Sequence, residues 1–241
     1  MDYNIASHLN LRASSSPDQI ALISPKRCLT FSQLESYTNR CCEALYRIGI
    51  RKGMRTVVML KPGRDFLAIC FSLLQLGAVI VFLDPGMGRK NLEKCLKMAA
   101  PQAFIGVPLA LFACRIFGWS SDSLRIRIAV DRPGWGAIQL KSFLSQIKKG
   151  TSPHETVIQP LDTAAIAFTS GSTGVPKGVV YSHKMFRAQY RQLRDEYEIL
   201  AGEVDLATFP LFSLFDPALG VTTVFPKMDF SRPGHIYAPN I

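Results

Sequence analysis

The chain has 241 residues, of which 48% are hydrophobic and 19% charged, and its formal net charge at pH 7 is +10. This composition is sufficient for a hydrophobic core and argues against a wholly disordered chain. The positive balance suits anionic partners such as nucleotides, but the basic residues come in ones and twos without a nucleic-acid-binding motif, so we do not expect a nucleic acid as a partner.

The six cysteines predict buried thiols rather than a zinc site or a disulfide framework. They stand at positions 28, 41, 42, 70, 95 and 114, and none forms a C-x-x-C pair. We therefore expect no metal site built from protein side chains. The amino terminus, Met1-Asp2-Tyr3-Asn4, lacks the basic and apolar regions of a signal peptide. Together these features favour a reduced, cytoplasmic setting.

The first 130 residues alternate between helical and strand-like patterns. We expect strands over residues 20–23, 28–30, 56–60, 78–83, 104–107 and 126–130, and helices over residues 4–11, 30–48, 62–77, 89–99 and 109–117. Thr30 or Ser32 can cap the second helix, and Gly49 can end it. Such alternation predicts an α/β fold with right-handed crossovers.

Residues 66–83 contain no charge and are just long enough to be considered as a membrane span. However, Gln75 and Gly77 divide this segment into a helix-like half and a β-branched half. A buried helix followed by a buried parallel strand has the same hydropathy. We favour this second interpretation and expect no membrane span.

Residues 121–160 are the least organised part of the sequence and predict a loop or a boundary that ends near Pro160. We accordingly divide the chain into residues 1–160 and residues 161–241. The second part should contain a strand at 164–168, a strand at 179–181, a helix at 184–200 and a strand at 221–225.

Residues 169–178, which read TSGSTGVPKG, are the densest run of glycine and hydroxyl side chains in the chain. Glycines let backbone N–H groups approach an anion, the hydroxyls add donors, and Lys177 adds a positive charge. This stretch predicts a polyphosphate-binding loop between two strands. It is neither a P-loop, because Lys177 is not followed by serine or threonine, nor a Rossmann fingerprint. The alternative is a flexible surface loop.

This loop resembles the signature phosphate loop of the adenylate-forming superfamily, which includes acyl-CoA synthetases, luciferases and peptide-synthetase adenylation domains. Residues 29–34 and 73–85 resemble two core segments of the same superfamily. A narrower resemblance, to the bacterial olefin β-lactone synthetases, lies in residues 81–89, 104–109, 202–206, 209–217, 228–229 and 232–233. This branch is often labelled as AMP-dependent or fatty-acid-CoA ligases.

The resemblance implies the N-terminal portion of the large domain of such an enzyme, built from layered α/β sheets, with the C-terminal half missing. The adenine-binding segment, the Mg²⁺-binding Thr-Glu pair, the ribose-binding aspartate and the C-terminal catalytic lysine of the superfamily have no counterpart in these residues. A separately encoded C-terminal half is therefore an expected partner.

The implied reaction is attack of a carboxylate on the α-phosphate of ATP, with Mg²⁺, to give an acyl-adenylate. Lys177 and Thr169 are the implied catalytic residues. The implied cofactor-binding residues are Thr169, Ser170, Gly171, Ser172, Thr173, Gly174, Lys177 and Gly178.

The resemblance places an acyl pocket near Phe209, Phe212 and Phe215, although these aromatic residues suit core packing equally well. The expected substrate is a fatty acid, with a β-hydroxyl if the product is a β-lactone. A fatty-acid-CoA ligase and a non-catalytic assembly module are the alternatives.

Overall fold

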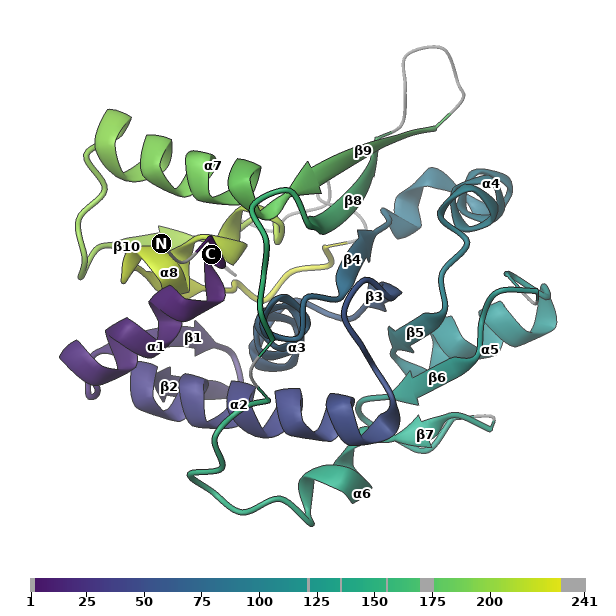
Figure 1. Ribbon diagram of the computed structural model, residues 1–241, viewed down its shortest axis with the longest axis horizontal. Helices are drawn as coiled ribbons and strands as arrows, with labels where there is room; N and C mark the ends of the chain where they lie inside the picture. The colour runs from purple at the N-terminus through teal and green to yellow at the C-terminus, as the bar shows by residue number, and fades with distance from the viewer. Residues whose placement is uncertain (1–2, 121, 135, 155, 170–175, 231–241) are drawn as a thin grey trace.

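The computed structural model describes residues 3–120, 122–134, 136–154, 156–169 and 176–230 as two β-sheets with helices packed around them (Figure 1). Seven strands form the larger sheet in the order β7-β6-β5-β3-β4-β8-β9, and four form the smaller in the order β10-β11-β1-β2. The strand bounds are β1 Ile20–Ser24, β2 Arg27–Thr30, β3 Arg55–Met59, β4 Val79–Phe82, β5 Ala103–Gly106, β6 Ile126–Ala129, β7 Ile138–Gln139, β8 Thr163–Thr169, β9 Lys177–Ser182, β10 Val204–Leu206 and β11 Thr222–Val224.

Helices lie between most of these strands, as the alternating sequence pattern predicts. Their bounds are α1 Ala6–Ser15, α2 Phe31–Ile48, α3 Arg64–Gln75, α4 Arg89–Ala99, α5 Pro108–Ile116, α6 Leu140–Leu144, α7 His183–Glu196 and α8 Asp216–Leu219, with short 3₁₀ turns at Pro85–Met87 and Phe212–Leu214. The α/β fold class is confirmed. In the larger sheet every pairing is parallel except that between β8 and β9.

The second helix begins and ends where its capping residues predict. The Thr30 side chain accepts a hydrogen bond from the Gln33 backbone, the Gln33 side chain accepts one from the Thr30 backbone, and Gly49 ends α2 with φ of 114°. These caps satisfy backbone groups that the helix itself leaves unpaired. Thr30, rather than Ser32, is the N-cap.

The uncharged segment at residues 66–83 forms α3 and β4, and both are buried. Residues 66–75 of α3 and all four residues of β4 are buried. Gly77 turns the chain between them with φ of 66°. Within the described part of the chain, no helix has the length and apolar character needed to cross a membrane.

The region between residues 121 and 160 is more ordered than the sequence suggests. It contains β6, β7 and α6, followed by residues 151–154 and 156–162, which we call the strap. The His154 ring stacks on Tyr46 of α2 at a centroid distance of 3.7 Å. The strap therefore runs along the molecule in a defined path towards β8.

The strap is also attached to the turns that precede β3 and β4. Lys52 Nζ forms an ion pair with Asp162 at 2.7 Å and donates a hydrogen bond to the Val157 carbonyl at 2.8 Å. A Cβ atom placed on Gly77 would lie 2.7 Å from Ile158 Cδ1, so glycine at this position lets the strap approach closely. These contacts are long-range, which is why composition alone indicates a loop here.

Strands from both sides of residue 160 occur in both sheets. β8 and β9 extend the sheet that β3–β7 begin, and β11 pairs in parallel with β1, with Leu22 opposite Thr223. The division into residues 1–160 and 161–241 does not coincide with the division into sheets and stays a prediction about subdomains. The helix expected over residues 184–200 ends at Glu196, because Glu198 adopts the left-handed conformation with φ of 52°.

Candidate active site

The β8–β9 hairpin brings the two implied catalytic residues together. Thr169 is the last residue of β8, Lys177 is the first of β9, and the two are paired across the strands. Both are exposed. The other predicted loop residues, Ser170, Gly171, Ser172, Thr173 and Gly174, lie outside the described residues.

The hairpin ends at an edge of the larger sheet where ligands are expected to bind. β8 runs parallel to β4, which runs parallel to β3, so Thr169 lies at the carboxyl ends of these strands. In open α/β sheets, ligands bind in the crevice outside the carboxyl ends of the strands. At the same edge, Asp84 accepts a hydrogen bond from the Gly86 backbone at 2.8 Å, so it acts as the turn residue that its position before proline predicts.

Gly178 has a packing role in addition to the one implied by the motif. It lies opposite Phe168, and a Cβ atom at this position would be 3.1 Å from Phe168 Cε1 and 3.4 Å from Ile166 Cγ2. Phe168 is buried in the apolar cluster that includes α4. The glycine therefore lets this ring lie against the β9 backbone.

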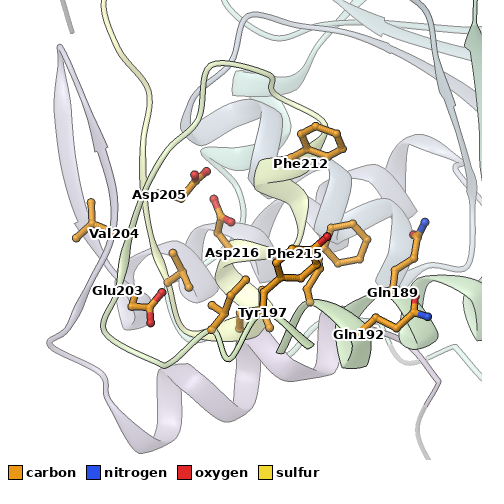
Figure 2. A pocket seen from close by; sticks show the side chains of 13 residues that line it. Gln189, Gln192, Tyr197, Glu203, Val204, Asp205, Phe212, Phe215 and Asp216 are labelled. Carbon is orange, nitrogen blue, oxygen red and sulfur yellow. The ribbon is translucent and has the colours of Figure 1, made fainter. Parts of the chain in front are cut away.

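A cavity of about 420 Å³ lies between α7, β10 and α8 (Figure 2). The predicted pocket residues Phe212 and Phe215 line it. Phe209 does not line it, but its ring centroid lies 5.2 Å from that of Phe212. Aliphatic side chains add further apolar surface: Leu193, Ile199, Val204, Leu219 and Val221. The remaining lining residues carry polar groups: Gln189, Gln192, Tyr197, Glu203, Asp205 and Asp216.

The carboxyl groups of Asp205 and Asp216, which no local sequence pattern indicates, form part of the polar lining of this cavity. Asp216 is 7% exposed, and its Oδ2 accepts a hydrogen bond of 2.9 Å from Thr223 Oγ1. Figure 2 shows its carboxyl group beside that of Asp205. Burial, followed by the charge of Asp205, raises the pKa of Asp216 to about 7.

These three residues meet only through tertiary pairing. Asp205 and Thr223 are partners in the parallel β10–β11 pair, and Asp216 begins the short helix between those strands. Asp216 precedes Pro217, a sequence typical of a turn or a helix start. No local pattern links it to Asp205, so the sequence offers no signal for the pair.

An aromatic series connects the base of the hairpin to the cavity. Tyr181 of β9 lies 5.7 Å from Phe186 of α7, and Phe186 lies 5.8 Å from Phe215, between ring centroids. In Figure 1 the start of β9 lies at the end of that strand away from α7, α8 and β10. The described residues thus place Thr169 with Lys177 and Phe212 with Phe215, in two separate places.

The comparison with known proteins supports the superfamily resemblance. Residues 9–225 match the family model described as AMP-binding enzyme. The chain is 43% identical over 242 residues to an olefin beta-lactone synthetase of Stenotrophomonas maltophilia, covering 95% of this chain and 44% of that protein. It is 41% identical over 241 residues to an olefin beta-lactone synthetase of Xanthomonas campestris, covering 95% and 43%.

Solved structures share the fold at lower identity. The Mycobacterium smegmatis MbtA apo structure superimposes with a TM-score of 0.82 at 23% identity, covering 95% of this chain and 44% of that chain. The N-terminal domain of FACL13 from Mycobacterium tuberculosis gives 0.79 at 22% identity, covering 95% and 58%.

The chain spans about half the length of the curated relatives it matches. The family model nevertheless covers both sheets, the phosphate hairpin and every residue that lines the cavity. The chain therefore belongs to the AMP-binding enzyme family.

Proposed function

We propose that this chain is the N-terminal part of an AMP-forming acid ligase that activates a fatty acid, carrying a β-hydroxyl, as its acyl-adenylate. The acid's carboxylate attacks the α-phosphate of ATP, and pyrophosphate leaves. The observation that carries this proposal is the pairing of Thr169 with Lys177 at the carboxyl edge of the sheet, on either side of a run of glycine and hydroxyl residues.

The residues of the hairpin suit a polyphosphate. Lys177 is exposed and can offset negative charge on the departing pyrophosphate, while the Thr169 hydroxyl can donate to a phosphate oxygen. Ser170, Gly171, Ser172, Thr173, Gly174 and Gly178 complete the proposed phosphate site. Mg²⁺, when bound through phosphate oxygens, supplies further charge neutralisation.

The acyl chain is proposed to occupy the cavity beside Phe212 and Phe215, with Phe209 at its margin. The aromatic series from Tyr181 to Phe215 supports a connection between this cavity and the hairpin. A mixed apolar cavity of about 420 Å³ is in the size range of small-molecule sites.

β-Lactone formation is the proposed second step, in which the substrate's hydroxyl oxygen attacks the activated carbonyl and AMP leaves. The identity of 43% to an olefin beta-lactone synthetase supports this over a CoA ligase, since a 4-coumarate–CoA ligase of Oryza sativa is 28% identical. A separately supplied C-terminal half is the proposed partner, and we propose a cytoplasmic location.

Isothermal titration of the chain with Mg·ATP tests the phosphate site. We expect measurable binding that Lys177→Ala weakens by about tenfold or more, because a phosphate loses its charge-assisted partner. Lys184→Ala is the matched control, since this exposed lysine lies on α7 outside the proposed site. Equal binding by all three proteins would contradict the assignment of Lys177.

Absence of binding by a folded wild-type chain would favour the alternative, a non-catalytic assembly module. Circular dichroism establishes folding in the same samples. Added aliphatic acid should increase pyrophosphate release only if the chain retains adenylation activity by itself.

A further inference from the structure

The cavity described above has two chemically different walls. Phe212, Phe215 and five aliphatic side chains supply the apolar surface, and Asp205 with Asp216 supplies part of the polar surface. A plain hydrocarbon chain would contact the apolar surface but would offer these carboxyl groups no hydrogen-bonding partner in addition to Thr223. Removing polar groups from water without such a partner is unfavourable.

We propose that Asp216, together with Asp205, is a specificity-determining pair that hydrogen-bonds a hydroxyl group at C3 of the fatty acid. This inference rests on the proposed function, because it takes the cavity as the acyl site. On this proposal, the carboxyl groups of Asp205 and Asp216 select hydroxylated acids over unsubstituted acids.

The geometry of Asp216 supports this role. Its Oδ2 accepts from Thr223 Oγ1 at 2.9 Å, which holds the carboxyl group in one orientation. Figure 2 shows the Asp216 carboxyl group beside that of Asp205, and burial raises the pKa of Asp216, which favours its protonated form. The pair thus offers both a donor and an acceptor, which is what a hydroxyl group requires.

The chemistry of the proposed product specifies which hydroxyl is involved. Closing a four-membered lactone forms a bond between the C3 oxygen and the activated C1 carbonyl, breaks the bond from C1 to AMP, and releases the hydroxyl proton. An acid without the C3 hydroxyl can be adenylated but cannot close this ring. A site that binds the C3 hydroxyl therefore favours the acids that can form the lactone.

Binding of three acids of equal chain length tests the inference. We would titrate the chain with decanoate, 3-hydroxydecanoate and 10-hydroxydecanoate by calorimetry. We expect 3-hydroxydecanoate to bind at least about tenfold more tightly than decanoate, the discrimination typical of a site that pairs a substrate hydroxyl. The 10-hydroxy isomer controls for polarity and should lack this advantage.

Asp216→Leu and Asp205→Leu should each bring the ratio of the affinities for 3-hydroxydecanoate and decanoate close to one. Asp195→Leu is the matched control, because this exposed carboxylate lies outside the cavity and pairs with Arg194. If Asp216→Leu does not fold, Asp205→Leu, at a half-buried position, still decides the outcome.

Equal affinity for the three acids would overturn the inference and leave the proposed function standing. An equal gain for the 10-hydroxy isomer would also overturn it. If no acid binds, the cavity is not the acyl site and the inference is wrong. ATP titration and measurement of pyrophosphate release test the proposed adenylation independently of this result.

Discussion

Gly178 shows how one residue can serve both a binding motif and the packing of a hairpin. In the sequence it is the last glycine of the phosphate loop, and in the structure it is the position at which the Phe168 ring lies against β9. The two roles have different consequences, because packing affects stability and phosphate contact affects affinity. Substitution can separate them.

We expect Gly178→Val to destabilise the fold by about 1 kcal/mol, since overpacking costs roughly 1–3 kcal/mol and the higher strand propensity of valine offsets part of it. Urea denaturation measures the change. In a Phe168→Leu background the penalty should shrink by at least about 0.5 kcal/mol, because the ring is gone. An unchanged penalty in that background would mean that the Phe168 contact is not its cause.

The raised pKa of Asp216 predicts that the stability of the chain depends on pH. Its pKa is about 7 in the folded chain, above its ordinary value, so the folded state holds a proton that the unfolded state has lost. The contribution of this group to stability is therefore highest at low pH and falls as pH rises from about 4 towards 7.

The free energy of unfolding should accordingly fall by roughly 2–3 kcal/mol more in the wild type than in Asp216→Asn between pH 5 and pH 8. Chemical denaturation at both pH values measures this difference. The comparison with the variant removes the contributions of other titrating groups; Asp162, whose pKa the Lys52 ammonium group holds below its usual range, is ionised throughout this pH window. Parallel profiles for the two proteins would rule out this role for Asp216.

The strap follows a defined path in the structure, although its sequence indicates a loop. Tyr46, Lys52 and Gly77 each contribute a contact to it, and these three residues lie in separate segments of the chain. The ion pair to Asp162 is partly exposed and contributes little on its own. Close packing against Gly77 is therefore the contact to test.

Gly77→Ala should destabilise the chain by about 1 kcal/mol through its positive φ alone, and should also displace Ile158. Gly53→Ala is the matched control, because Gly53 has φ of 77° and nothing within 4 Å of an added Cβ. Limited trypsin digestion after Lys148 and Lys149 should accelerate only in Gly77→Ala. Equal acceleration in both variants would indicate that general destabilisation, not release of the strap, is responsible.

Across the whole molecule, the two ends of the described chain are joined by the smaller sheet. β1 lies between β2 and β11, so the first and last strands of the chain are neighbours. β9 and β10 stand at sheet edges, and Val180 and Val204 on them are more than half exposed. An edge strand offers unpaired backbone groups to a further strand, which supports the proposal of a second half as partner.

The sequence by itself determined the local elements and the chemical character of the phosphate loop. Three kinds of feature depend on only a few neighbouring residues: the caps Thr30 and Gly49, the burial pattern of α3 and β4, and the hydroxyl–glycine run before Lys177. Backbone preference and the period of the side chains are sufficient to predict them. The superfamily resemblance came from this loop and from other short stretches, residues 29–34 and 73–85.

Only the tertiary structure decided which distant residues meet. The pairing of β10 with β11 brings Asp205 to Thr223 and Asp216, and the approach of the strap to Gly77 orders a region of loop-like composition. Such contacts depend on the sum of many weak packing terms over the whole chain rather than on any short pattern. The acid pair and its cavity, unlike the phosphate loop, are therefore properties of the fold.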